Sequence, residues 1–152
     1  MAVVLGIRCT HADMSFAVLA GSQAAPRVLA VGEVAYPKNY QRPQRLQWIV
    51  QEADSLIKTH RVDLVVIKQF EGMTKGNRYE KRVEAEGAIA IAAGQNGIKQ
   101  VYKKRKNTLA KDLGLKGRAK YLETSLNTAA IPSYSDLPDK RQEAVLCAWS
   151  AL

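Results

Sequence analysis

The sequence is poor in cysteine and histidine, and this scarcity limits the sites that it can build. It has two cysteines, Cys9 and Cys147, and two histidines, His11 and His60. A structural zinc site needs four such ligands at close spacing, and a disulfide framework needs several paired cysteines. Neither pattern is present, so we expect buried free thiols and no metal held by these residues.

Long apolar runs are also missing. No stretch approaches the roughly 18 consecutive apolar residues of a membrane span. The first charged residue, Arg8, comes after an apolar run, which reverses the charge order of a secretory signal peptide. We therefore expect a cytoplasmic protein without membrane contact. With 47% hydrophobic residues, the chain is long enough for one core, and we expect residues 1–152 to form a single domain.

Acidic residues are outnumbered. There are 14 of them against 23 lysines and arginines, which gives a formal net charge of +9. The excess is concentrated between Lys99 and Lys120, where nine basic residues are opposed by Asp112 alone. Such a density is typical of a face that binds a polyanion such as nucleic acid.

The hydrophobic pattern predicts an α/β fold. Three short β-branched runs separated by turn residues indicate an antiparallel meander, and apolar residues at three-and-four spacing indicate amphipathic helices. A continuous apolar run between helices is typical of a buried parallel strand. The expected elements are strands at 1–8, 15–20, 28–36, 62–70 and 98–102, and helices at 44–60, 79–97, 108–113, 118–129 and 139–152.

Three stretches, in this order, resemble the RNase H-like superfamily, and most closely its branch of RuvC-type Holliday-junction resolvases. VVLGIR is similar to the first strand of that family, which ends in Gly-Ile-Asp, and VVIKQF is similar to its Ile-Glu strand. The basic segment from VYKKRKN and the helix DKRQEAVLCAW look like the end of the family's chain, with Glu143-Ala144 in place of an Asp-Ala pair. Small bacterial families of this superfamily carry a similar Ile-Lys strand. The resemblance covers roughly the whole chain and implies an RNase H-like mixed sheet, a three-strand meander plus parallel strands, with helices on both faces.

The resemblance also implies a catalytic site that this sequence does not complete. In the family, carboxylates from the first strand, the middle strand and the last helix hold two divalent cations that hydrolyse a phosphodiester. Here Arg8 and Lys68 occupy the first two positions and only Glu143 keeps an acid. A magnesium ion accepts oxygen ligands, not cationic side chains. We therefore expect a nuclease-inactive, nucleic-acid-binding protein without a cofactor.

The fate of the two cations can be predicted from the same topology. Lys68 or Arg8 is expected to pair with Glu143, and with Asp139 one turn earlier on the same helix. The simpler alternative is a strand-end Lys68 whose ammonium extends to solvent. Three further acids, Glu80, Glu84 and Glu86, are expected on the solvated face of their helix.

Two other functions remain open at this stage. One is a nuclease that uses Mg²⁺ or Mn²⁺ on relocated acids, for which the candidates are Asp13, Glu71, Asp139 and Glu143. The other is a protein-interaction module of the same fold, in which the positive charge steers an acidic partner. The Ala/Ile-rich segment 85–93 suits either a homodimer or the core.

The phosphate-binding residues are expected in two places, the glycine-rich loop after the Ile-Lys strand and the basic segment. Phosphate contacts of this kind give affinity that falls with salt and carries no sequence information. DNA and RNA are equally compatible with them. The candidates are Lys75, Arg78, Lys103, Lys104, Arg105, Lys106, Lys116, Arg118 and Lys120.

Overall fold

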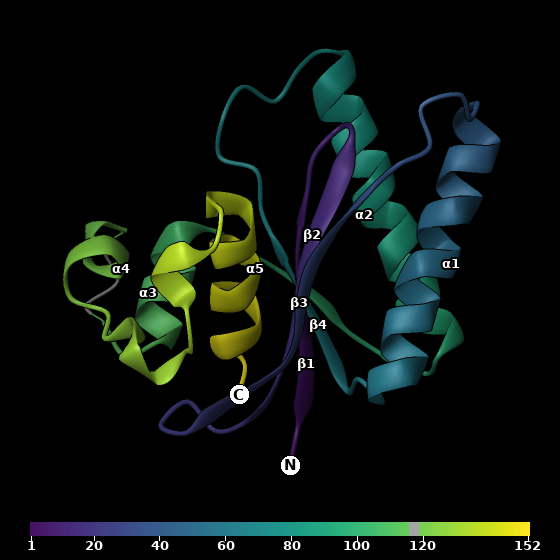
Figure 1. Cartoon of the computed structure of the whole chain (residues 1–152). Coiled ribbons are helices and arrows are strands. Elements are labelled where there is room, and N and C mark those ends of the chain that lie inside the picture. Colours follow the sequence, from purple (N-terminus) through teal and green to yellow (C-terminus); the bar gives the residue numbers. More distant parts are fainter. Residues whose placement is uncertain (116–118) are drawn as a thin grey trace.

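The computed structural model describes residues 1–115 and 119–152, which build a five-stranded mixed sheet with helices on both faces (Figure 1). The strand order is β3-β2-β1-β4-β5. The first three strands form the predicted antiparallel meander, and β4 and β5 run parallel to β1. The strands are β1 (Val3–Cys9), β2 (Asp13–Gly21), β3 (Pro26–Ala35), β4 (Leu64–Lys68) and β5 (Val101–Lys104).

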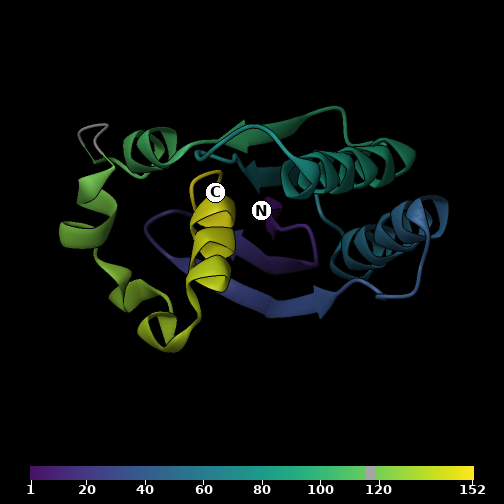
Figure 2. The ribbon, with the colours of Figure 1, turned by 90° about the horizontal axis from the view of Figure 1, so that it is seen from above.

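The helices divide between the two faces of the sheet. Figure 2 shows α1 (Arg42–His60) and α2 (Asn77–Gln95) side by side on one face, with α5 (Asp139–Trp149) on the other. On the side of α5 lie α3 (Lys106–Asp112), α4 (Lys120–Thr124) and two short 3₁₀ turns, η1 (Thr128–Ala130) and η2 (Tyr134–Asp136). The mixed sheet and its two helical layers confirm the predicted fold class.

The central strand β1 shows how the sequence assigns side chains to the two faces. Successive residues of a strand point to opposite faces. Leu5, Ile7 and Cys9 therefore enter the core under α1 and α2. Val4 enters the core under α5, and Arg8 lies on that same face by the alternation. Both cysteines are buried free thiols, as predicted.

Gly6 brings α5 unusually close to the sheet. A Cβ atom built at this position would lie 2.0 Å from the carbonyl oxygen of Ala144 and 2.6 Å from the amide nitrogen of Ala148. Only a residue without a side chain allows this approach. Because Glu143 precedes Ala144 and Arg8 is the next residue of β1 on the same face, the contact also sets the distance between those two side chains.

The predicted helix at 118–129 is wrong over most of its length. Residue 118 lies outside the described residues, α4 ends at Thr124, and η1 follows after a turn. The reason is local: the side chain of Asn127 accepts a hydrogen bond from the backbone N–H of Ala129 at 3.1 Å, a bond that competes with helix continuation. Among the described residues, no helix combines the length and the apolar character that crossing a membrane requires.

Candidate functional site

Three parallel strands carry basic residues at or next to their carboxyl ends, on one edge of the sheet. Ile67 of β4 lies between Ile7 of β1 and Lys103 of β5, and Lys68 pairs with Lys104 in the next step of the register. Arg8 occupies the corresponding step of β1. In open sheets with parallel strands, ligands bind outside the carboxyl ends of the strands. The basic strand ends therefore mark the place where this fold offers a site.

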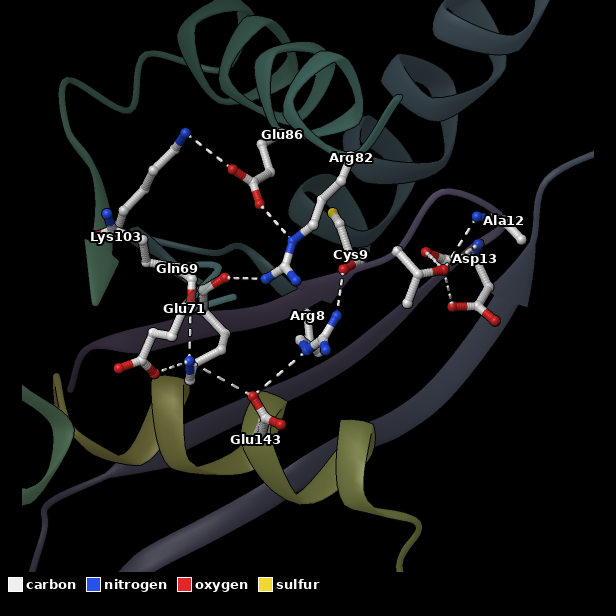
Figure 3. A network of polar contacts seen from close by, with 12 residues as sticks. Arg8, Cys9, Ala12, Asp13, Gln69, Glu71, Arg82, Glu86, Lys103 and Glu143 are labelled. Atoms are coloured by element: carbon white, nitrogen blue, oxygen red, sulfur yellow. Dashed lines mark hydrogen bonds and ion pairs between the residues drawn. The ribbon is translucent and has the colours of Figure 1, made fainter. Parts of the chain in front are cut away.

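Lys68 is buried at this edge and surrounded by oxygen atoms. The residue is 3% exposed. Its Nζ donates to the Glu71 carboxylate at 2.5 Å and to the Gln69 carbonyl at 2.8 Å, and it lies 3.8 Å from Glu143 Oε2. Gln69, Glu71 and Glu143 lie close together in Figure 3, and each of them contacts the Lys68 ammonium group. The alternative of a lysine extended to solvent is therefore wrong.

Arg8 approaches Glu143 from the other side. Its Nε lies 3.4 Å from Glu143 Oε2, the same oxygen that faces Lys68, and its Nη1 donates to the Cys9 carbonyl at 2.6 Å (Figure 3). Within the described residues the buried Arg8 Nε makes no hydrogen bond. The predicted pairing of Arg8 and Lys68 with Glu143 is confirmed, and one carboxylate oxygen serves two cations.

Glu71 completes the cluster. Burial alone would raise the pKa of its carboxyl group. The hydrogen bonds from Lys68 and from the backbone N–H of Lys106, with the charges of both lysines, outweigh burial and lower that pKa. Glu71 therefore stays ionised as a partner of Lys68. The sequence did not predict this pair, because the pairing depends on the path of the loop after β4.

A second ion-pair cluster lies behind the first, on α2. Arg82 Nε donates to Glu86 at 3.2 Å and Arg82 Nη2 donates to the Lys68 carbonyl at 2.8 Å, while Lys103 Nζ lies 2.9 Å from Glu86 (Figure 3). Burial and the neighbouring Arg8 charge lower the pKa of Arg82. The expectation of a solvated Glu86 is wrong, since the residue is 4% exposed.

The sequence contained a signal for this second cluster. Arg82 and Glu86 fall on the same three-and-four spacing as the buried residues Ala85, Ile89 and Ala93. Glu84, on the neighbouring face, pairs instead with Arg42 and Arg45 of α1. Glu80 is exposed, as expected.

The remaining candidate acids do not gather into a metal site. Asp13 accepts a hydrogen bond from Thr10 at 2.7 Å and pairs with Lys140 at 3.3 Å. Burial would raise the pKa of Asp13, but the hydrogen bond from Thr10 and the Lys140 charge contribute to a net lowering. Asp139 makes no ion pair with any described residue, so the expected pairing of Arg8 or Lys68 with Asp139 is wrong. Residues 1–115 and 119–152 contain no group of three or more His, Cys, Asp or Glu side chains arranged to hold a metal ion.

The divalent cations that the fold implies do not fit the side chains that are present. Two-metal catalysis requires converging carboxylates, and here Glu71 and Glu143 already contact Lys68. A second cation, Arg8, lies beside Glu143. Like charges at contact distance repel by about 1 to 4 kcal/mol near a protein surface, so these cations oppose metal binding at this place.

The candidate phosphate-binding residues fall into three groups. Lys104 is drawn inward, with its Nζ 2.8 Å from Asp112 and 3.0 Å from the Ser150 hydroxyl. Lys103 and Lys106 are about half exposed at the edge of the site. Lys116 and Arg118 lie outside the described residues. The remaining candidates, which are exposed, are Lys75, Arg78, Arg105 and Lys120.

Two hollows connect these residues to the strand ends. One, of about 180 Å³, is lined by Arg8, Lys68, Arg82 and Lys106 among others. The other, of about 270 Å³, shares Arg8 and Arg82 with it and extends to Lys75 and Arg78. The shared residues make the two hollows adjacent, so a row of cations follows the carboxyl edge of the sheet.

Comparison with known proteins gives a likeness of structure alone. No family model and no curated protein matches the sequence. RuvC from Thermus thermophilus in complex with a Holliday junction substrate aligns over 99% of this chain and 92% of its own, with 18% identity and a TM-score of 0.81. A second structure of Thermus thermophilus RuvC aligns over 97% and 92%, with 21% identity and a TM-score of 0.78.

A yeast protein extends the likeness. The mitochondrial Holliday junction resolvase Ydc2 aligns over 99% of this chain and 79% of its own, with 11% identity and a TM-score of 0.62. These alignments run through the whole sheet, including the meander and the strands that carry Arg8 and Lys68. The chain therefore has an RNase H-like fold of the RuvC type.

Proposed function

We propose that this protein is a nuclease-inactive member of the RNase H/RuvC-like fold that binds the phosphate backbone of nucleic acid along the basic edge of its sheet. One observation carries the proposal: Arg8 and Lys68 stand at two of the three expected carboxylate positions and share the third, Glu143. The site thus contains tethered cations where a nuclease of this fold would hold metal ions.

The cluster is suited to binding and poorly suited to hydrolysis. Hydrolysis by this fold needs a metal-activated water and a metal at the leaving oxygen. A lysine or arginine side chain can neutralise a phosphate and donate hydrogen bonds to it, but it does not supply that activated water. The Arg8 side chain is 21% exposed and lines both hollows at the strand ends, so its guanidinium can meet a phosphate there.

The partner is inferred from charge and from the fold. Lys75, Arg78, Arg105 and Lys120 are exposed, and no described carboxylate lies within ion-pair distance of them. Exposed cations without acidic partners attract a polyanion and release its counterions on binding. The similar RuvC structure contains a Holliday junction, which supports nucleic acid as the class of partner.

The test is a binding titration with labelled single-stranded, duplex and four-way-junction DNA and with matching RNA, over a salt series, with and without Mg²⁺ or Mn²⁺. Each endpoint is run on a denaturing gel. We expect binding that falls steeply with salt, does not need a divalent ion, and leaves every strand intact.

The matched variants have the same change in net charge. Lys75→Glu/Arg105→Glu alters the carboxyl edge, and Arg27→Glu/Lys58→Glu alters exposed residues near the opposite ends of the strands. The first pair should weaken binding at least about ten-fold and the second less than about two-fold. An equal loss of affinity in the two double variants would mean that binding depends on net charge alone and not on the carboxyl edge.

Two results would replace the proposal. Divalent-dependent cleavage that is lost in Glu143→Gln would establish a nuclease on relocated acids. Absence of binding to every nucleic acid would favour a protein-interaction module instead.

We propose in addition that the protein forms a homodimer through the outer face of α2. The inner face of the Ala/Ile-rich segment, including Ala85, Ile89 and Ala92, is fully buried in the chain's own core. Its outer face exposes Val83 and Ile91, with 39% and 55% exposure. Sedimentation should give twice the monomer mass for the wild type and the monomer mass for Ile91→Glu; a monomeric wild type would refute the dimer.

A further inference from the structure

A pocket of about 480 Å³ opens beside the cation cluster, between α3, α4, η2 and α5. This volume is within the range of about 300 to 1,000 Å³ that small-molecule sites occupy. Much of its wall is apolar, because the helices that frame it present leucines and one tyrosine to it. These residues are Leu109, Leu122, Leu126, Leu146 and Tyr134.

On the α5 wall of the pocket, the polar atoms that remain available are hydrogen-bond acceptors. Asp139, Gln142 and Glu143 line it from one side of α5. The Nε2 of Gln142 already donates to the Tyr134 carbonyl at 3.1 Å, which leaves its Oε1 to accept. Within residues 1–115 and 119–152, Asp139 makes no ion pair. A ligand that fits these groups must therefore present N–H donors.

Tyr134 supplies a flat, neutral surface. Burial, together with the negative charges of Glu143 and Asp139, raises the pKa of its phenol to about 12. An aromatic ring among leucines is the kind of surface on which proteins stack an unstacked nucleobase.

The mouth of the pocket is basic. Lys68 and Lys106 line both this pocket and the 180 Å³ hollow that contains Arg8 and Arg82. Lys106 is the more accessible of the two, since its side chain is 44% exposed against 4% for Lys68, and its Nζ lies 4.0 Å from Glu123. A phosphate one ribose away from a base inside the pocket would meet these cations.

We propose that this pocket binds a single nucleotide whose base carries an exocyclic amine, with guanine preferred, and whose phosphate contacts Lys106. Guanine presents two adjacent donors, N1–H and the N2 amine, which one carboxylate can accept together; uracil presents a single N–H. The nucleotide is either free or an unstacked unit of a bound strand. The second source rests on the proposed function, whereas the first does not.

The experiment titrates 5′-GMP, guanosine, 5′-UMP and inorganic phosphate into the full chain by calorimetry. We expect GMP to bind at least about ten-fold more tightly than UMP and more tightly than guanosine or phosphate. Absence of GMP binding, or equal binding of UMP, overturns the inference.

Three pairs of variants locate the site, each with a control that lines none of the pockets described above. Thr128→Trp fills the pocket and should abolish GMP binding, whereas Thr124→Trp should not. Asp139→Asn should remove the preference over UMP, whereas Asp136→Asn should keep it. Lys106→Gln should weaken GMP but not guanosine, whereas Lys111→Gln should weaken neither. If Thr128→Trp does not fold, the aspartate and lysine pairs decide; binding that is unchanged in all three test variants overturns the inference.

A second arm separates the two sources of the nucleotide. Oligothymidine is compared with the same strand carrying one central guanine. If the pocket takes a unit of a strand, the guanine strengthens binding at least about five-fold in the wild type but not in Asp139→Asn; no gain, with GMP still bound, assigns the pocket to free nucleotides. Strands that bind without any response to GMP or guanine refute this inference alone, and strands that never bind refute the proposed function alone.

Discussion

Glu143 holds an unusual position among the side chains of this protein, because one of its oxygens faces both Arg8 and Lys68. A buried pair that loses one partner leaves an uncompensated charge. Replacement of either cation therefore changes the environment of the other. Arg8, Lys68 and Glu143 are therefore energetically coupled.

The first expectation concerns the stability of the protein at low pH. The folded state lowers the pKa of Glu71 below its ordinary value of 4.5 and also lowers the pKa of Asp13. Between these lowered pKa values and about pH 4.5, the unfolded chain binds more protons than the folded chain. The stability that the two carboxylates contribute is therefore fully present above about pH 4.5 and is lost as the pH falls through the folded pKa values. Denaturant unfolding between pH 3 and 7 should show this loss, and the loss should be smaller in Glu71→Gln. An unchanged profile in that variant would mean that Glu71 gains nothing from Lys68.

The second expectation concerns a double variant with acids at the two positions where the RuvC-type family has them. Arg8→Asp/Lys68→Glu would place three carboxylates, with Glu143, where a two-metal site needs them. The double variant should bind Mn²⁺ saturably in calorimetry and the wild type should not, with circular dichroism as the check of folding. Saturable Mn²⁺ binding by the wild type would contradict the proposed loss of the metal site.

Part of the site was predictable at the residue scale, because the resemblance to the RuvC-type family implies that the positions of Arg8, Lys68 and Glu143 converge. The contacts of Glu143 with both cations agree with that prediction. The partners Glu71 and Lys106 were not predictable in the same way. They meet through a loop whose path no periodic pattern records.

At the scale of elements, α5 and β1 form the contact that positions the site. Gly6 allows the backbone of α5 to lie directly on the strand. Elsewhere the chain tolerates added bulk: at Gly94 of α2 a Cβ atom would meet nothing within 4 Å. The two glycines thus offer a matched comparison.

The third expectation uses this pair. Gly6→Ala should destabilise the protein by about 3 kcal/mol or more, because overpacking that forces backbone shifts costs about that amount. Gly94→Ala should stabilise by about 0.4 to 1 kcal/mol, because alanine restricts the unfolded chain. Urea unfolding measures both. A neutral Gly6→Ala would mean that α5 can shift away from β1 without loss.

The helices also show where sequence patterns stop being informative. α1 and α2 were predictable because long apolar stripes pack against the sheet. The segment after Lys120 has fewer than two turns of pattern, and the side chain of Asn127 stops the helix that its composition favours. The pocket beside α4 was therefore invisible in the sequence, since it depends on how short elements end.

At the scale of the whole molecule, the net charge of +9 is spread unevenly with respect to the sheet. The ends of β1, β4 and β5 bring cations from distant parts of the chain to one edge. Parallel strands make this possible because their carboxyl ends meet. Under the proposed function, this edge acts as one polyanion-binding surface.

The fourth expectation follows from counterion release. Each phosphate contact contributes about 0.7 to the slope of log affinity against log salt for a single strand. Arg105→Gln should reduce the magnitude of that slope by about 0.7, whereas Arg27→Gln, near the amino end of β3, should leave it unchanged. A fluorescence titration at five or so salt concentrations gives the slope. An equal reduction of the salt slope in Arg105→Gln and Arg27→Gln would mean that the carboxyl edge does not contact the phosphates preferentially.

The shared oxygen of Glu143 limits how single substitutions at Arg8 or Lys68 could produce a metal site. A chain with Arg8 and Lys68 that regains one acid keeps one cation beside it, so the intermediate has neither a complete metal site nor a complete pair of cations. Under the proposed function, return to hydrolysis requires two substitutions whose first step impairs binding without restoring catalysis. On that proposal, no single substitution at Arg8 or Lys68 would both restore hydrolysis and keep binding intact.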